Sequence, residues 1–138
     1  MGFFNKIFGD SENKGSQQKR IQWIELTEIK QVGQLISESF DKPVFVFKHS
    51  TRCAISRMVL KQFESHYAIG EDKADPYFLD LLTYREISNE LANRLSVMHQ
   101  SPQLILIDQG KCIYTVSHSE IDAEELRERL IEKKHNHL

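Results

Sequence analysis

The stretch from Pro43 to Tyr67 constrains the fold of this chain more than any other part of the sequence. It opens with Val44–Phe47, a short run of β-branched and aromatic residues behind a proline, which is typical of a buried strand. The polar segment Lys48–Thr51 follows and predicts a turn whose last two residues can cap a helix. Apolar residues then recur with helical spacing and define the inner face of that helix, namely Ile55, Val59, Leu60, Phe63 and Tyr67. The stretch therefore predicts a strand, a turn and a helix, with Cys53 in the first helical turn.

Cys53 is the candidate nucleophile of the chain. At the start of a helix it faces unpaired backbone N–H groups and the positive end of the helix dipole, which favour a thiolate over a thiol. Lys48, His49 and Arg52 add positive charge before it, and Arg57, one turn later, is expected to lie over it. The alternative is a buried, inert cysteine. The carboxyl end of a strand is where open α/β sheets place their sites, which favours the reactive interpretation.

Strands and helices alternate along the rest of the chain. Strands are predicted near residues 21–26, 44–47, 76–82, 103–107 and 112–116, and Asp108–Lys111 is predicted to be a hairpin turn. The other helices are marked by helical spacing of apolar residues after Thr27, around Leu91 and after Ser119, and Thr27 and Ser119 are their predicted caps. The resulting order, βαβαβαββα, predicts an α/β fold with a mixed central sheet flanked by helices.

The chain of 138 residues divides at residue 20. Residues 1–20 form an N-terminal segment with an apolar tip, Met1–Gly9, and a polar linker, Asp10–Arg20, and residues 21–138 form the folded domain. The tip is too short for a secretory signal, and no stretch is long enough to be a transmembrane segment. We expect a frayed terminus. The alternative is a docking segment for a membrane surface or a partner.

Charge and cysteine content exclude several classes of protein. A net charge of −2 gives no reason to expect binding to nucleic acid. Two cysteines far apart in sequence do not form a disulfide scaffold, so we expect a reducing, cytoplasmic location. The scattered histidines and cysteines lack the spacing of metal ligands, so no metal site is expected.

The order of elements, a cysteine at a strand-to-helix turn, and Ser101–Pro102 before the fourth main strand together resemble thioredoxin across residues 21–134. In that family a cis proline faces the redox cysteine, and the residue before it pairs its backbone with the substrate. The resemblance therefore assigns substrate binding to Pro102 and Ser101. An X–Pro bond is the kind that adopts the cis form at low cost.

The active-site run departs from thioredoxin in a consistent direction. Ser56 stands where thioredoxins have a second cysteine, and Ala54–Ile55 replaces their Gly-Pro. Arg52 replaces a tryptophan, and Phe47 replaces the buried aspartate that deprotonates the second thiol. The loss of both the second thiol and its base indicates a monothiol mechanism, in which a thiol from outside the protein resolves the disulfide.

The run His49–Ser56 is similar to the site of the YtxJ-type family of thioredoxin-like proteins, although Ala54 replaces the proline of their Cys-Pro-Ile-Ser. That family is associated with monothiol exchange involving bacillithiol. The resemblance implies that Cys53 attacks mixed disulfides between bacillithiol and client proteins, with bacillithiol as thiol co-substrate and no bound cofactor. It implies that Ser56 hydrogen-bonds the Cys53 sulfur, and that the substrate is bound by Thr51, Arg52, Arg57, Ser101 and Pro102.

Two other functions stay open at this point. His49, Cys53, Ser56 and Arg57 also reproduce a His-x-x-x-Cys-x-x-Ser-Arg pattern of arsenate-reductase-like enzymes, which additionally need distant arginines around the oxyanion. A non-catalytic adaptor with the same fold is the other alternative. An inert Cys53 would favour that adaptor.

Cys112 is the other cysteine, and we predict that it does not resolve the disulfide. It follows the hairpin turn, whereas the fourth main strand begins beside the site at Pro102. Five or six strand residues separate the two cysteines by about 15–20 Å, and a disulfide needs Cα atoms within about 7 Å. Cys112 is therefore expected to pack as a small apolar residue.

Overall fold

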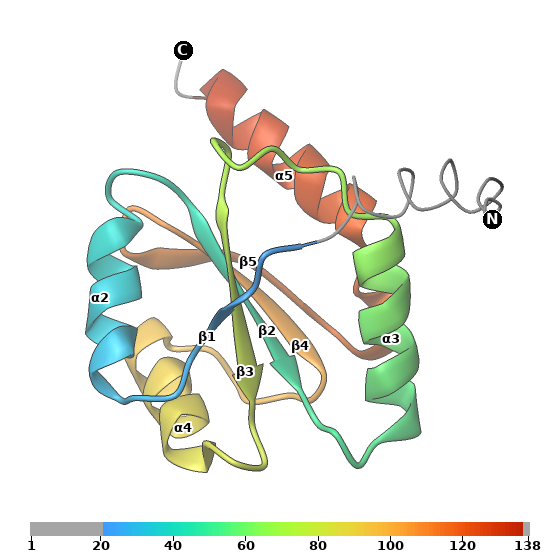
Figure 1. The fold of residues 1–138 in the computed structure, drawn as a ribbon. Helices are drawn as coiled ribbons and strands as arrows, with labels where there is room; N and C mark the ends of the chain where they lie inside the picture. The colour runs from blue at the N-terminus through green and yellow to red at the C-terminus, as the bar shows by residue number, and fades with distance from the viewer. Residues whose placement is uncertain (1–20, 137–138) are drawn as a thin grey trace, which may run out of the picture.

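The computed structural model describes residues 21–136, and the predicted N-terminal segment, residues 1–20, lies outside them. The described elements follow one another in the predicted order (Figure 1). They are β1 (Ile24–Glu25), α2 (Lys30–Glu38), β2 (Val44–His49), α3 (Ala54–Ser65), β3 (Asp75–Asp80), α4 (Arg85–Leu95), β4 (Gln103–Asp108), β5 (Lys111–Ser117), the 3-10 helix η1 (His118–Glu120) and α5 (Ala123–Asn136).

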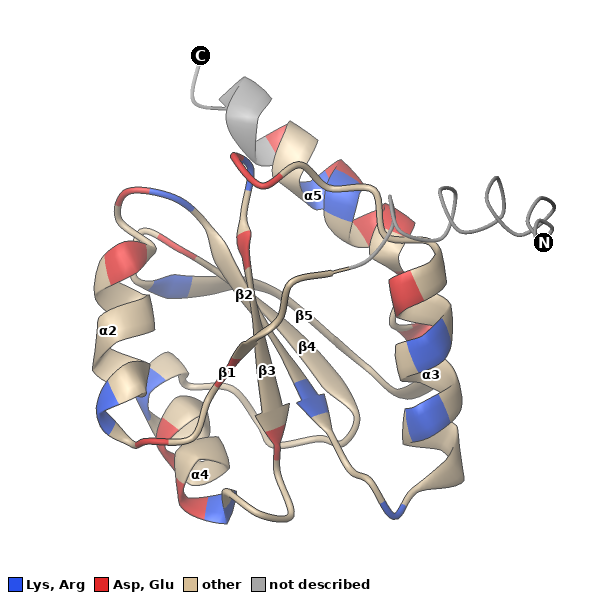
Figure 2. Cartoon of the chain, in the orientation of Figure 1, with Lys and Arg blue, Asp and Glu red and all other residues tan. Residues whose placement is uncertain are grey.

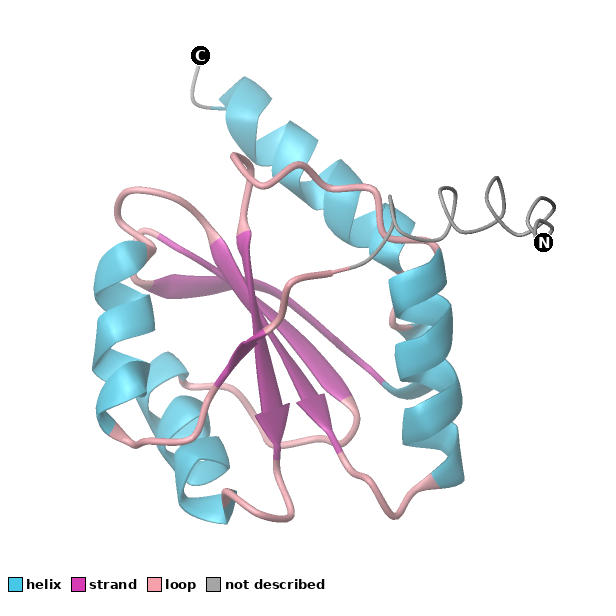
Figure 3. Ribbon diagram, viewed as in Figure 1, coloured by secondary structure: helices cyan, strands magenta, loops and turns pink. Residues whose placement is uncertain are grey.

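The five strands form one mixed sheet in the order β1-β3-β2-β4-β5. β1, β3 and β2 run parallel, whereas β4 is antiparallel to β2 and β5 is antiparallel to β4. The carboxyl ends of β2 and β3 therefore meet at one edge of the sheet, where the loops to α3 and α4 begin (Figure 3). The predicted α/β fold with a mixed sheet is confirmed.

Helices cover both faces of the sheet, because the central strands are buried on both sides. α2 and α4 pack on one face and α3 and α5 on the other (Figure 1). Alternation along β2 divides its side chains between the faces: Phe45 and Phe47 point toward α3, and Val44 and Val46 point toward α2 and α4. An aromatic cluster fills the α3 side, where Trp23 packs against Phe45, Phe47, Phe63 and Phe78.

The first strand and helix are shorter than predicted. The first strand is confined to Ile24–Glu25, at the edge of the sheet, and α2 ends at Glu38. Phe40, predicted on the inner face of that helix, lies beyond its end and is exposed. Thr27 does not cap α2; its backbone N–H donates to Oε1 of Gln31 at 2.8 Å. Propensity and spacing located these elements, but tertiary contacts set their ends.

The hairpin and the last helix differ in how well they were predicted. Gln109 and Gly110 both have positive φ, 53° and 77°, as a two-residue hairpin turn with the right twist requires. Ser119, the predicted cap of the last helix, instead lies in η1. Asp122 takes the capping role, because its Oδ1 accepts the backbone N–H of Glu124 at 3.2 Å.

Candidate active site

The turn that presents Cys53 is shorter than the sequence predicted. Lys48 and His49 are the last two residues of β2, and both are buried instead of lying in the turn. The chain leaves the sheet at Ser50, whose carbonyl accepts the backbone N–H of Cys53 at 3.2 Å. Side chains alternate between the two faces of β2, so His49, two residues after Phe47, points to the same face as Phe47. This is the face on which α3 packs.

Cys53 is half-buried and is the N-cap of α3, one residue before the helix begins. Its carbonyl accepts the first helical hydrogen bond, from the backbone N–H of Arg57 at 3.1 Å. No side chain caps α3, so the prediction that Ser50 or Thr51 does so is wrong. The thiol therefore stands directly at the positive end of the helix, where anions are stabilised.

Ser56 is buried and holds the turn to the helix. Its Oγ lies 2.8 Å from Nδ1 of His49 and accepts the backbone N–H of Ser50 at 3.1 Å. The predicted role of Ser56 as a hydrogen-bond partner of the Cys53 sulfur is replaced in this structure by these two contacts. Ile55, predicted on the inner face of the helix, is instead 51% exposed, and Ser56 is the residue of the first turn that faces inward with Val59 and Phe63.

The two arginines next to Cys53 in the sequence have different surroundings. Arg52 lies exposed in the turn, next to Thr51. Nη1 of Arg57 donates to the Thr51 carbonyl at 3.0 Å and so braces the turn two residues before Cys53. Figure 2 shows Lys and Arg positions in blue at the end of β2, in the turn after it and in the first half of α3.

Ser101–Pro102 is a cis peptide bond, as predicted. The register pairs Gln103 with Lys48, so Pro102 stands opposite the last residue of β2, His49. Pro102 is buried, and its carbonyl accepts the backbone N–H of His118 at 3.0 Å. The Cys53 turn follows β2, and the Ser-Pro segment precedes β4. Because β2 and β4 are antiparallel neighbours, the two segments lie at the same end of the sheet.

A buried lysine lies on the opposite face of β2 from His49. Lys48 is 1% exposed, and its Nζ lies 2.8 Å from Nδ1 of His99, which is also 3.3 Å from Oγ of Ser88. Burial, together with the nearby Arg85, lowers the pKa of Lys48 to about 8. Burial and the positive charges of Lys48 and Arg85 lower the pKa of His99 as well.

His49 is in a similar position on the α3 side. Burial lowers its pKa below the ordinary value, and the positive charge of Arg57 lowers it further. The carboxylates of Asp80 and Glu64 act in the opposite direction. The His49 ring also lies 5.6 Å from the ring of Phe78, with the planes tilted. His49 is therefore held mainly as a neutral imidazole at neutral pH.

Position 47, where thioredoxins have the base of their dithiol site, holds an aromatic side chain. Phe47 is fully buried in the aromatic cluster. Within residues 21–136 no group of three or more His, Cys, Asp or Glu side chains is arranged to hold a metal ion. None of the described helices is both long and apolar enough to cross a membrane.

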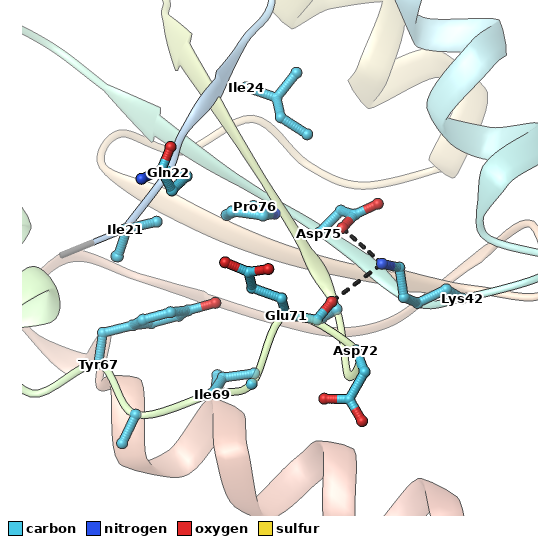
Figure 4. Close-up of a pocket in the computed structure, with 13 residues that line it drawn as sticks. Ile21, Gln22, Ile24, Lys42, Tyr67, Ile69, Glu71, Asp72, Asp75 and Pro76 are labelled. Carbon is cyan, nitrogen blue, oxygen red and sulfur yellow. Dashed lines mark hydrogen bonds and ion pairs between the residues drawn. The ribbon is translucent and has the colours of Figure 1, made fainter. Parts of the chain in front are cut away.

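A pocket of about 940 Å³ lies away from Cys53, at the amino end of β3 (Figure 4). Lys42 spans its rim, with Nζ 2.9 Å from Oδ1 of Asp75 and 3.1 Å from the Glu71 carbonyl. Ile21, Tyr67 and Ile69 line its other side. None of the predicted site residues lines this pocket.

The buried positions of Lys48 and His49, and the contact of Lys48 with His99, were not predicted from the sequence. For His49 a signal was present: Phe45, Phe47 and His49 are spaced as alternating residues of one strand, which places all three on one face. For His99 there was none, because its contact with Lys48 joins residues 51 positions apart.

The fold and the site together define a thioredoxin-fold protein of thiol redox chemistry. Among solved structures the chain is similar to a proposed oxidoreductase with a thioredoxin fold, at 32% identity and a TM-score of 0.66, covering 82% of this chain and 95% of that one. It is also similar to thioredoxin from Malassezia sympodialis, at 22% identity, 82% and 91% coverage and a TM-score of 0.63. Mitochondrial thioredoxin 3 from Saccharomyces cerevisiae shares 14% identity, with 80% and 94% coverage and a TM-score of 0.62.

The family itself follows from the sequence of the domain. The family model described as monothiol bacilliredoxin BrxC matches residues 24–126. The chain therefore belongs to the monothiol bacilliredoxin family, which confirms the resemblance drawn from the run His49–Ser56.

Proposed function

We propose that this protein removes bacillithiol from mixed disulfides on client proteins, with Cys53 as the nucleophile. The observation that supports the proposal most directly is the position of Cys53 at the N-terminus of α3 with serine, not cysteine, at position 56. Such a site has one attacking thiol and no internal partner in the turn. Membership of the bacilliredoxin family supports bacillithiol as the small thiol.

The proposed reaction proceeds by two thiol–disulfide exchanges. The Cys53 thiolate attacks the bacillithiol sulfur of the mixed disulfide, a Cys53–bacillithiol bond forms, and the client leaves as a thiolate that takes a proton from water. A second bacillithiol thiolate then attacks the bacillithiol sulfur bound to Cys53. This step releases oxidised bacillithiol, in which two bacillithiols are joined by a disulfide, and restores the Cys53 thiolate. Free bacillithiol is thus the reductant, and no bound cofactor is required.

The surroundings of Cys53 suit both parts of such a substrate. Arg52 is exposed beside the thiol, and guanidinium groups bind carboxylates such as those of bacillithiol. Apolar side chains that are at least 40% exposed lie on the segments that follow β2 and β3 and precede β4, namely Ile55, Met58, Leu82 and Met98. They offer apolar contact to a client chain whose backbone pairs with Ser101, beside Pro102.

The test uses a model client with one cysteine carrying bacillithiol. The purified protein plus free bacillithiol should release the client thiol, measured by intact mass, and Cys53→Ser should reduce the rate by at least about 100-fold, because the nucleophile is lost. Release at an unchanged rate by Cys53→Ser would contradict the proposal. Arsenate reduction with bacillithiol, without release of the client thiol, would favour the arsenate-reductase alternative instead.

A further inference from the structure

His49 is a buried titratable residue that the proposed reaction does not use. It is 6% exposed, stands four residues before Cys53, and contacts the helix that begins after Cys53 through Ser56. Side chains that face it with charge come from two elements: Asp80 from the end of β3, and Arg57 and Glu64 from α3. From the β4 side, the register places Pro102 opposite it.

The hydrogen bonds of Ser56 show how His49 is connected to the site. A serine hydroxyl has one hydrogen to donate and two positions that accept. The backbone N–H of Ser50 occupies one accepting position of Ser56 Oγ, at 3.1 Å. Ser56 is fully buried, so its own hydrogen needs a protein acceptor, and Nδ1 of a neutral His49 lies 2.8 Å away. In this state the Ser56 hydrogen is directed at His49 and is not available to Cys53.

Protonation of His49 reverses that arrangement. An imidazolium donates from both nitrogens, so Nδ1–H would donate to Ser56 and fill its second accepting position. The Ser56 hydrogen must then turn to another acceptor. Cys53 is the N-cap residue of α3 and Ser56 is the third helical residue, N3, and the capping box shows that groups at these two positions come within hydrogen-bonding reach of each other. The Cys53 sulfur is the acceptor that this spacing offers.

We propose that His49 is a positioning residue that decides, through the Ser56 hydroxyl, whether the Cys53 sulfur receives a hydrogen bond. The inference rests on the proposed function only in taking Cys53 as the attacking thiol. With His49 neutral, the sulfur lacks this hydrogen bond and is the stronger nucleophile once ionised. With His49 protonated, the thiolate is stabilised and attacks more slowly, because nucleophilicity falls with basicity.

The test is the rate of Cys53 alkylation by iodoacetamide as a function of pH, in a Cys112→Ser background. His49→Phe removes the acceptor, so the Ser56 hydrogen turns to Cys53 at every pH. The pH midpoint should fall by about one unit, and the rate at high pH should fall about threefold. His49→Asn keeps an oxygen, Oδ1, at the place of Nδ1 that accepts from Ser56 but cannot be protonated, so at neutral pH it should react like the parent. At pH values low enough to protonate His49, the parent should react about threefold faster than His49→Asn, because a gain of about tenfold in thiolate outweighs a loss of about threefold in nucleophilicity.

Ser56→Ala is the matched control. Adding His49→Phe to Ser56→Ala should change neither the midpoint nor the rate at high pH, since the hydroxyl that transmits the effect is absent. An equal effect of His49→Phe with and without Ser56 would overturn the inference, as would identical profiles for the parent and His49→Asn throughout the acid range in which both stay folded. Thermal unfolding of each variant identifies any that has lost its fold, and the comparison of the parent with His49→Asn still decides if His49→Phe has done so.

Alkylation needs no bacillithiol, so the two proposals fail separately. The expected alkylation profiles, together with no release of bacillithiol from a client, would overturn the proposed function and leave the role of His49 standing. If bacillithiol is released but substitution of His49 leaves the alkylation profiles unchanged, the inference is overturned and the proposed function stands.

Discussion

The two cysteines of this chain lie at opposite ends of the central strands and in opposite kinds of surroundings. Cys53 is the N-cap of a helix, in a turn beyond the carboxyl end of β2. Cys112 begins the return strand of the hairpin and pairs with Ile107, which itself pairs with Val44 at the amino end of β2. The comparison shows that position in the fold gives two chemically identical residues different surroundings.

The surroundings of Cys112 stabilise the protonated thiol. Its Sγ donates to the Tyr114 carbonyl at 3.6 Å, and its side chain packs against the core shared with α2 and α4. Burial raises the pKa of Cys112 above its ordinary value. A thiol with a raised pKa and partial burial is a poor nucleophile at neutral pH.

The largest expected difference is in adduct formation with oxidised bacillithiol. Intact mass spectrometry should find one bacillithiol per molecule, located on Cys53 by peptide mapping. Cys53→Ser should abolish the adduct, and Cys112→Ser should leave both its yield and its release unchanged. An intramolecular Cys53–Cys112 disulfide in folded monomer would contradict the comparison, because about five strand residues at 3.3 Å each separate the two ends.

A second cysteine at position 56 should convert the site from a monothiol to a dithiol. In the Cys112→Ser background, Ser56→Cys places a thiol one helical turn from Cys53, as in the Cys-x-x-Cys sites of thioredoxins. Mild oxidation should then reduce the free thiols, measured by a colorimetric titration, from two per molecule to none. Adding Cys53→Ser should leave the single remaining thiol free. Retention of both thiols in the first variant would show that position 56 does not face Cys53.

Buried Lys48, near the end of β2 that leads to Cys53, should make the folded protein less stable than an apolar residue at the same position would. Its pKa of about 8, against an ordinary value of 10.5, means that protonation opposes folding. That difference corresponds to about 3 kcal/mol, and loss of the contact with His99 returns about 1 kcal/mol. Lys48→Met should therefore stabilise the protein by about 2 kcal/mol below pH 8, measured by urea denaturation.

The pH dependence gives the sign of this effect. Between pH 8 and 10.5 the unfolded chain binds the Lys48 proton more tightly than the folded chain, so wild-type stability rises with pH. The advantage of Lys48→Met should accordingly shrink across this range. The exposed Lys61 serves as the control, since Lys61→Met should change stability little at any pH. A Lys48→Met protein that is less stable than wild type at pH 6.5 would contradict the prediction.

The smallest expected effect is on stability, from a substitution of Gly110 in the hairpin turn that precedes Cys112. Its φ of 77° is one that other residues adopt at a cost, and an added Cβ would lie 2.6 Å from Cζ of Phe40. Gly110→Ala should destabilise the fold by about 1–2 kcal/mol and leave Cys53 alkylation unchanged. Gly33→Ala, in helix α2 with nothing within 4 Å of the added Cβ, should instead stabilise by about 0.5–1 kcal/mol. Equal changes in stability for the two substitutions would contradict the explanation from backbone conformation and Cβ contact at Gly110.

Much of the fold was predictable because its signals are local. Val44–Phe47 reads as a strand from its residue types, and the turn at Gln109 and Gly110 requires the positive φ that its residue types permit. Element ends were less predictable. The prediction ended the second strand at Phe47 because Lys48 and His49 are polar, whereas tertiary contacts extend it to His49.

The candidate site was predicted in its parts and not in its contacts. Cys53 was placed correctly because a helix start is visible in the sequence, and the cis bond at Ser101–Pro102 was placed correctly because the resemblance to thioredoxin implied it. The partners of Ser56 and Arg57 were not, because side chains of similar reach compete for them. Ser56 bonds to His49 and Arg57 to Thr51, and only the packed turn decides that outcome.

The sequence by itself determined the order of elements, the family, the single thiol of the site and the absence of a carboxylate at position 47. These follow from residue identity and local periodicity, which need no knowledge of distant contacts. The tertiary structure alone decided that Lys48 and His49 are buried on opposite faces of one strand, that His99 meets Lys48, and that Ser56 turns inward to His49. The physical reason is that burial and long-range hydrogen bonds exist only when segments far apart in sequence pack together. Burial is also the main cause that lowers the pKa values of Lys48 and His49.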